Sequence, residues 1–137
     1  MTLRRRHLTL ALAALALAGC SNKPGDADAL RLFEEDNRRL KVDDLFAFEN
    51  PRRVNGYEQG QYYVIEMEFE VVAKVAYDEA VAELARKAGG DLFSKMSMDH
   101  DLQVLQNEFG KFSKGQRFTK KRPIALKRTE AGWALVE

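Results

Sequence analysis

The chain has 137 residues, of which 22 are basic and 21 are acidic, so its net charge is about +1 and predicts nothing by itself about binding to nucleic acid or to a membrane. It holds a single cysteine, which excludes a disulfide bond within the chain. The length suits one domain with a modest core and is too short for two.

The start of the chain has the pattern of a secretory signal peptide. A basic segment with Arg4, Arg5 and Arg6 leads directly into an apolar run over residues 8–18. This run is well short of the roughly 20 residues that a helix needs to span a bilayer. We therefore expect a cleaved signal peptide rather than a permanent transmembrane anchor.

The apolar run ends in Leu17-Ala18-Gly19-Cys20, where the chain resembles the lipobox of bacterial lipoproteins. The resemblance implies cleavage directly before the cysteine, a diacylglycerol on its thiol, and acyl chains that hold the protein to a membrane. Aspartate after the cysteine commonly retains such proteins at the inner membrane. Ser21 at this position implies the outer membrane, with the domain facing the periplasm. The alternative interpretation is an ordinary buried thiol that follows a core helix.

This interpretation divides the chain into three parts. Residues 1–19 are the signal peptide, residues 20–28 are the lipidated cysteine and a polar tether, and residues 29–137 form one periplasmic domain. At about 3.3 to 3.6 Å per extended residue, the tether after the cysteine spans at most about 26 to 29 Å. The domain is therefore expected to lie close to the lipid headgroups.

Hydrophobic periodicity predicts a helix and then a strand. Leu30, Phe33 and Leu40 repeat at helical spacing, which predicts a helix over roughly residues 28–41. From Gln61 to Val75, apolar residues alternate with a row that contains three glutamates. This alternation predicts a strand that buries one face.

An earlier strand is expected to pair with the strand that begins at Gln61. It is predicted to end near Val54 and to continue into a polar loop over residues 55–60. Pro51 places this strand at a sheet edge or puts a bulge in it, because proline donates no hydrogen bond to a ladder.

Two helices are predicted in the second half of the chain. A short helix begins at Asp78 and ends at the Gly89-Gly90 pair, since glycine favours helix ends. A second helix carries Leu105 and Phe109 on one face.

The tail of the chain predicts a hairpin. Its strands cover residues 116–128 and 132–137, and Phe118, Ile124 and Leu126 face the core. The element order is then α-β-β-α-α-β-β. This order predicts an α+β fold in which an antiparallel four-stranded sheet has its helices packed on one side.

The sequence offers little for a catalytic or metal site. Apart from His7 in the signal segment, the only histidine is His100, which stands between two aspartates. Adjacent side chains do not point the same way, so this run predicts no metal site, and a helix amino terminus with surface charges explains it. His100 with a neighbouring aspartate is a candidate base for Ser94 or Ser97, but neither serine lies in a nucleophile motif. We expect a non-enzymatic protein without cofactor or metal; a small hydrolase using His100 is the alternative.

Charge is distributed unevenly along the chain. Residues 111–128 hold basic residues and no acidic ones, whereas acidic residues dominate residues 58–91. One interpretation is internal pairing, in which the basic strand lies beside the acidic strand on the exposed face of the sheet. The other is that Lys120, Lys121 and Arg122 bind an anionic partner, such as lipid headgroups, lipopolysaccharide or an acidic protein.

The leading hypothesis combines these observations. It is a non-catalytic lipoprotein, held to the membrane by acyl chains on Cys20, whose domain binds or helps to assemble another envelope component. The periplasmic location argues against nucleic acid as a partner. The alternatives are the hydrolase and an inhibitor or immunity-type lipoprotein that blocks a lytic enzyme.

Overall fold

The structure, a computed structural model, describes residues 23–137. The predicted signal peptide, Cys20 and the beginning of the tether lie outside the described residues. The elements of the described part follow one another without long gaps. They are α1 (Asp26–Leu40), β1 (Phe46–Gln59), β2 (Tyr62–Ala73), α2 (Tyr77–Lys87), α3 (Leu92–Phe109), β3 (Arg117–Thr129) and β4 (Gly132–Leu135).

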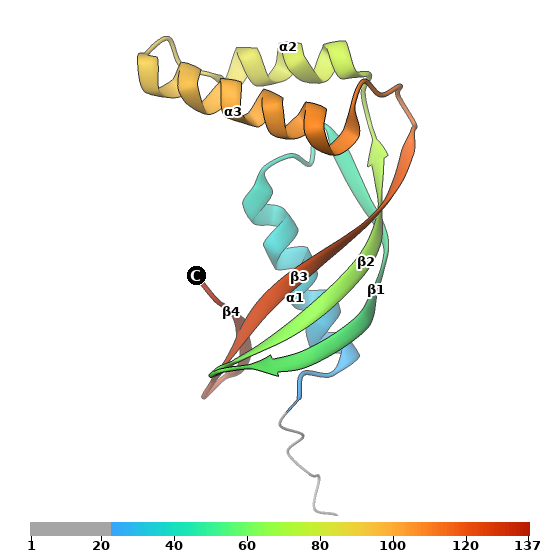
Figure 1. Ribbon diagram of the computed structural model, residues 1–137, viewed down its shortest axis with the longest axis vertical. Coiled ribbons are helices and arrows are strands. Elements are labelled where there is room, and N and C mark those ends of the chain that lie inside the picture. The colour runs from blue at the N-terminus through green and yellow to red at the C-terminus, as the bar shows by residue number, and fades with distance from the viewer. Residues whose placement is uncertain (1–22) are drawn as a thin grey trace, which may run out of the picture.

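The four strands form one antiparallel sheet in the order β1-β2-β3-β4. Each strand pairs with the next one along the chain. The sheet is curved; α1 lies along its concave side, and α2 and α3 form a hairpin across its upper end (Figure 1). The predicted α+β fold, with the order α-β-β-α-α-β-β and helices on one side of a four-stranded sheet, is confirmed.

The central strand β2 supplies much of the core. A strand turns successive side chains to opposite faces, so every second residue points to the concave side. The buried row consists of Tyr63, Ile65, Met67, Phe69, Val71 and Ala73. The glutamates of the alternate row point to the convex face. The predicted alternation is confirmed, although the strand ends two residues before Val75.

The predicted end of the first strand was wrong. β1 does not stop near Val54 but continues to Gln59, and only Gly60 and Gln61 form the turn. Residues 55–59 pair with β2 in spite of their polarity. They do so because β1 is an edge strand, where side chains and backbone groups on the outer side remain in water.

The first part of β1 is irregular, in line with the prediction for Pro51. The pairing register with β2 shifts between Glu49 and Arg52. Asn50 adopts a positive φ of 51° within this stretch. Both features expected of a strand proline, an edge position and a bulge, are therefore present.

α1 packs its apolar face against the middle of the sheet. Phe33 is fully buried, and its ring centroid lies 4.8 Å from that of Phe69 and 6.5 Å from that of Phe48. The helix begins two residues earlier than predicted, because the Asp28 carboxylate accepts a hydrogen bond from the Gly25 N–H at 3.3 Å.

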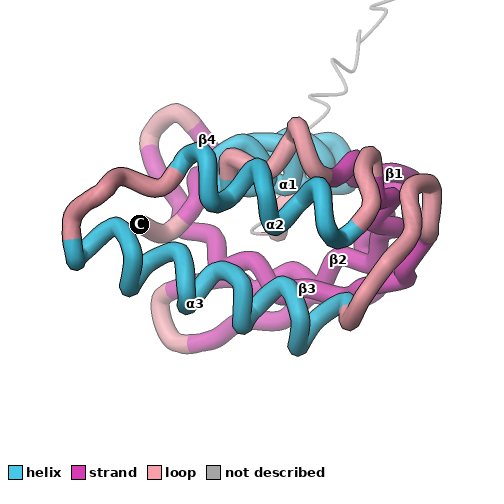
Figure 2. The backbone as a smooth tube through the Cα atoms, turned by 90° about the horizontal axis from the view of Figure 1, so that it is seen from above, coloured by secondary structure: helices cyan, strands magenta, loops and turns pink. Residues whose placement is uncertain are grey.

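The hairpin of α2 and α3 is held to the sheet at its base. Ala80, Leu105 and Phe112 are buried there, and the ring of Phe46 stacks on that of Phe109 at 4.9 Å. Seen from above, the two helices run side by side across the end of the sheet (Figure 2).

The whole core lies within residues 24–135. The first buried residue of the described part is Pro24 and the last is Leu135, and the core residues form one connected cluster. A chain that begins at Ser21 therefore contains every core residue of the described part.

Candidate functional site

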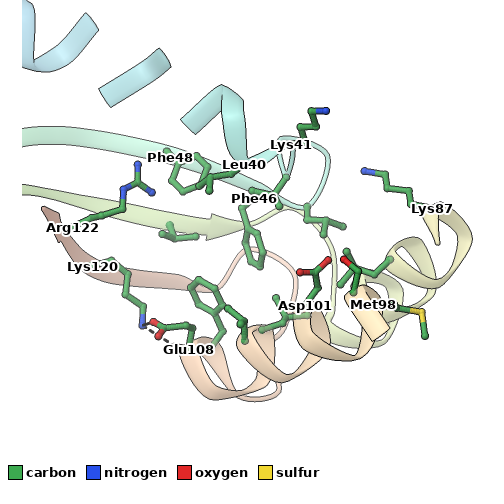
Figure 3. Close-up of a pocket in the computed structure, with 18 of the residues that line it drawn as sticks. Leu40, Lys41, Phe46, Phe48, Lys87, Met98, Asp101, Glu108, Lys120 and Arg122 are labelled. Atoms are coloured by element: carbon green, nitrogen blue, oxygen red, sulfur yellow. Dashed lines mark hydrogen bonds and ion pairs between the residues drawn. The ribbon is translucent and has the colours of Figure 1, made fainter. Parts of the chain in front are cut away.

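The principal cavity of the described part lies between the sheet and the helical hairpin. It has a volume of about 850 Å³ and is bounded by the carboxyl end of α1, the upper halves of β1 and β2, and the facing sides of α2 and α3 (Figure 3). Its walls are largely apolar. They include Phe46, Phe48, Phe69, Val71, Leu105 and Phe109.

Strand and helix periodicity explain why these side chains share the cavity. Phe69 and Val71 belong to the concave row of β2, and Phe46 and Phe48 face them from β1. On α3, residues three and four positions apart line one face. This face changes in character along the helix. From start to end it presents Ser94, Ser97, Asp101, Val104, Leu105, Glu108 and Phe109.

One end of the cavity carries charged side chains of both signs. Lys87 and Asp101 lie at this end; the Asp101 carboxylate points into the cavity, whereas the ammonium of Lys41 points away from it (Figure 3). Lys87 pairs with Asp44 at 2.7 Å, and this hydrogen bond raises the pKa of Lys87 and lowers that of Asp44. Within residues 23–137, neither Lys41 nor Asp101 has an ion-pair partner. The Asp101 carboxylate is therefore an unpaired charge that a ligand in the cavity can reach.

The opposite end of the cavity carries cations that are already paired. The Arg122 guanidinium lies 5.2 Å from the ring centroid of Phe33 and 5.3 Å from that of Phe69. It contacts a carboxylate oxygen of Asp36 at 2.9 Å. Burial lowers the pKa of Arg122, and the Asp36 charge opposes that shift.

Lys120 is paired at the same end as Arg122. Its ammonium donates to the Glu108 backbone carbonyl at 2.7 Å and reaches the Glu108 carboxylate at 3.3 Å. It also lies 5.0 Å from the centroid of the Phe109 ring. Lys120 thus joins β3 to the end of α3.

The three basic residues proposed from sequence do not form one patch. All three border the cavity, but their side chains have different partners: Lys120 contacts Glu108 on α3 and Arg122 contacts Asp36 on α1, whereas Lys121 lies 3.7 Å from Glu68 in the row of β2 that points to the convex face. The convex face carries further pairs of this kind, such as Arg117 with Glu49 at 2.6 Å. The structure thus shows the internal pairing that was one of the two interpretations of the basic run.

The pair of Arg52 with Glu68 gives a testable pH effect. The hydrogen bond from Arg52 lowers the pKa of the Glu68 carboxyl, with smaller help from Lys121. A carboxyl with a lowered pKa stabilises the fold above its unfolded pKa, and this contribution is lost as the pH falls through the folded pKa. Arg52→Gln is expected to raise the pKa of Glu68 toward its ordinary value. NMR titration of the Glu68 side chain measures this, and an unchanged midpoint would contradict the pairing.

In the described part of the chain, no hydrogen bond joins His100 to either serine proposed with it, and the Ser94 hydroxyl donates to Asp91 instead. His100 is exposed in the middle of α3 and does not line the cavity, whereas Ser94 and Ser97 do. The expected position of His100 at a helix amino terminus was wrong, because α3 begins at Leu92. In the described part of the chain, no cluster of three or more histidine, cysteine, aspartate or glutamate residues is arranged to hold a metal ion.

The cavity was not predicted from sequence. Its cationic residues Lys120 and Arg122 were identified, but its apolar walls and the charges of Lys41 and Asp101 were not. A signal was present in the helical spacing of Ser97, Asp101 and Val104, which places a mixed polar and apolar stripe on one face of α3.

The geometry of the cavity is the basis on which a function is proposed. Among residues 23–137, no helix combines the length and the apolar character that crossing a membrane requires. No protein-family model, curated protein sequence or solved structure matches the chain.

Proposed function

We propose that the protein is a lipid-anchored lipoprotein of the cell envelope whose domain is a non-catalytic binding module. The anchor is the acylated Cys20, and the binding site is the cavity between the sheet and the α2–α3 hairpin. The ligand is an apolar part of another envelope component. This proposal keeps the lipoprotein hypothesis and moves its binding site from the basic run to the cavity.

The size and the lining of the cavity support this proposal. Ligand pockets typically measure about 300 to 1,000 Å³ and combine apolar walls with a few polar groups, and this cavity of about 850 Å³ has both features. Leu40 and Val104, which line it, are exposed by 47% and 45%. Exposed apolar side chains next to an apolar cavity favour a ligand that covers them.

The position of the tether gives the proposed module an orientation. The amino-terminal end of α1 lies toward one end of the molecule and the α2–α3 hairpin lies at the other (Figure 1). Between them, α1 has 15 residues and covers about 22 Å at 1.5 Å per residue. With Cys20 held in a membrane, the cavity end points away from that membrane, which favours a ligand approached from the periplasm.

Site-specific photocrosslinking in intact cells tests this function with the full chain. Val104→benzoylphenylalanine places a photoreactive group at the cavity. Val54→benzoylphenylalanine is the matched control, because Val54 is exposed by 38% but lies on β1 outside the cavity. We expect one defined adduct at position 104 and none at position 54, with the adduct identified by mass spectrometry.

A second substitution tests whether formation of the adduct depends on the cavity. Ser97→Trp fills the space from α3, and Gln103→Trp adds the same ring on a part of α3 that does not line the cavity. The adduct at position 104 is expected to disappear with Ser97→Trp and to persist with Gln103→Trp. An adduct that survives Ser97→Trp, or equal adducts at positions 104 and 54, would overturn the proposed function.

A further inference from the structure

The solvent-exposed face of α3 carries two soft metal ligands at helical spacing. Met96 and His100 stand four positions apart on this helix. Residues at this spacing share one face of a helix, with about 5 to 6 Å between their Cβ atoms. Helical side chains lean toward the amino terminus of the helix, so the His100 ring leans toward Met96. The thioether and the imidazole are therefore neighbours on the surface of α3.

Both side chains are accessible, and neither has a structural role in the domain. Met96 is exposed by 63%, and His100 is exposed as well. In the described part of the chain, His100 takes part in no hydrogen bond or ion pair, so its ring is free to bind an ion. Neither residue lines the cavity or belongs to the core cluster. The fold and the proposed binding site thus leave this pair without an explanation.

The other methionines of the described residues lie away from His100. A helix turns by about 100° per residue, so Met98, two positions from Met96 and from His100, points to a different side of α3. Met98 lines the cavity and is only partly exposed. Met67 is fully buried in β2. Among residues 23–137, Met96 is therefore the one thioether that shares a face with His100.

The charge of α3 favours a cation at this pair. The helix carries three carboxylates and one lysine, and the carboxylates are Asp99, Asp101 and Glu108. Asp99 is exposed and lies three positions after Met96, a spacing that also places two residues on neighbouring parts of one face. Within residues 23–137, neither Asp99 nor Asp101 has an ion-pair partner. The local field thus attracts a positive ion.

We propose that Met96 and His100 bind a soft monovalent cation of the Cu(I) class. Thioether sulfur selects Cu(I) among biological metal ions, and imidazole also suits copper. Cu(I) and its silver analogue Ag(I) accept two ligands in a nearly linear arrangement, so this pair suffices. The flexible methionine side chain can adjust the position of its sulfur to the imidazole. The prediction of no metal site considered the aspartates beside His100, whereas the second ligand stands one helical turn before it.

A divalent ion such as Zn²⁺ fits the same residues less well. Zinc sites in proteins hold the ion with three or four thiolate, imidazole or carboxylate ligands. The two aspartates that flank His100 point in other directions from the helix. In the described part of the chain, no group of three or more histidine, cysteine, aspartate or glutamate residues could hold such an ion. Preference for a soft monovalent ion is therefore the property that identifies the proposed site.

Titration with silver nitrate in a chloride-free buffer tests the site residue by residue. The protein is the chain from Ser21 to Glu137, which has no cysteine and holds every core residue of the described part. It carries a purification tag without histidine. Carbon-13 labels in the methionine methyl groups make each methionine visible by NMR. We expect Ag(I) to shift the Met96 methyl signal and the His100 ring signals together, while the Met98 and Met67 signals stay in place.

Matched variants assign the bound ion to the pair. Met96→Leu and His100→Gln are each expected to lower the affinity for Cu(I) about tenfold or more, because each leaves a single ligand. Met98→Leu makes the same replacement on another side of α3 and is expected to bind Cu(I) like the original chain. Affinity is measured by competition with a coloured Cu(I) chelator in the presence of ascorbate. Circular dichroism verifies that these variants keep the fold.

Two results would overturn the proposed metal site. Equal affinity of the original chain, Met96→Leu and Met98→Leu for Cu(I) would show an adventitious ion only. Binding of Zn²⁺ as tight as that of Cu(I), dependent on His100 but not on Met96, would assign the ion to the imidazole and carboxylates instead. Neither result depends on the crosslink at position 104, so the metal site and the proposed function succeed or fail separately.

Discussion

Arg122→Glu is expected to destabilise the domain by about 3 kcal/mol or more, which lowers the midpoint of thermal unfolding by about 10 to 15 °C. The guanidinium fills the space between Asp36 on α1 and the Phe33 and Phe69 rings. A glutamate there places a second carboxylate beside Asp36 and removes the cation from the ring faces. Both changes cost free energy because the Arg122 side chain is only 25% exposed.

Lys121→Glu is the matched control for this prediction. It makes the same charge reversal one residue earlier, but the Lys121 side chain is 67% exposed and its contact with Glu68 is 3.7 Å long. Exposed pairs contribute at most about 1 kcal/mol, so a small change in the unfolding midpoint is expected. Chemical and thermal unfolding followed by circular dichroism compare the two variants. Equal stability of both would show that Arg122 does not join α1 to β3.

The sheet was predictable because its central strand is strongly patterned. Alternation from Tyr63 to Ala73 leaves one register in which the apolar row is buried. Phe118, Ile124 and Leu126 repeat the pattern in β3, and the last two are buried. Short turns join β1 to β2 and β3 to β4, so these two pairs follow from the chain order, whereas α2 and α3 separate β2 from β3 in the sequence.

The length of β1 was not predictable from its own residues. Asn55 and Gly56 are typical of turns. They enter the ladder because Glu66 and Ile65 on β2 offer partners opposite them. Tertiary pairing thus overrides local preference in this strand, as is common at sheet edges.

The alternation of side chains along β3 separates Lys121 from Lys120 and Arg122. The sequence prediction nevertheless grouped the three residues as one binding set. Phe118, Ile124 and Leu126 were assigned to the core, and the same row contains Lys120 and Arg122, while Lys121 belongs to the other face. The cavity itself could be recognised only from the three-dimensional structure. Phe46 and Leu105 lie 59 positions apart in the sequence, and only the packing of the hairpin over the sheet brings them to the wall of one cavity.

Cys20→Ala is expected to abolish acylation completely and to leave the precursor uncut. The lipobox resemblance assigns the diacylglycerol to the Cys20 thiol and cleavage to the bond before it, and alanine has no group to carry a thioether. Growth with a radioactive or alkyne-bearing fatty acid, followed by gel mobility, measures both effects. Ser21→Ala is the control, since it changes the neighbouring residue without removing the thiol, and it should be labelled and cut.

The same variant also tests the orientation proposed for the domain. Cys20 precedes α1 in the sequence, and the amino-terminal end of α1 lies away from the α2–α3 hairpin (Figure 1). Residues of this hairpin line the cavity. Two or more acyl chains make attachment lasting, and one chain alone binds reversibly. A Cys20→Ala protein that is still labelled and processed at the same bond would remove the lipid anchor from the proposal. The cavity would then stand as a binding site without a defined membrane.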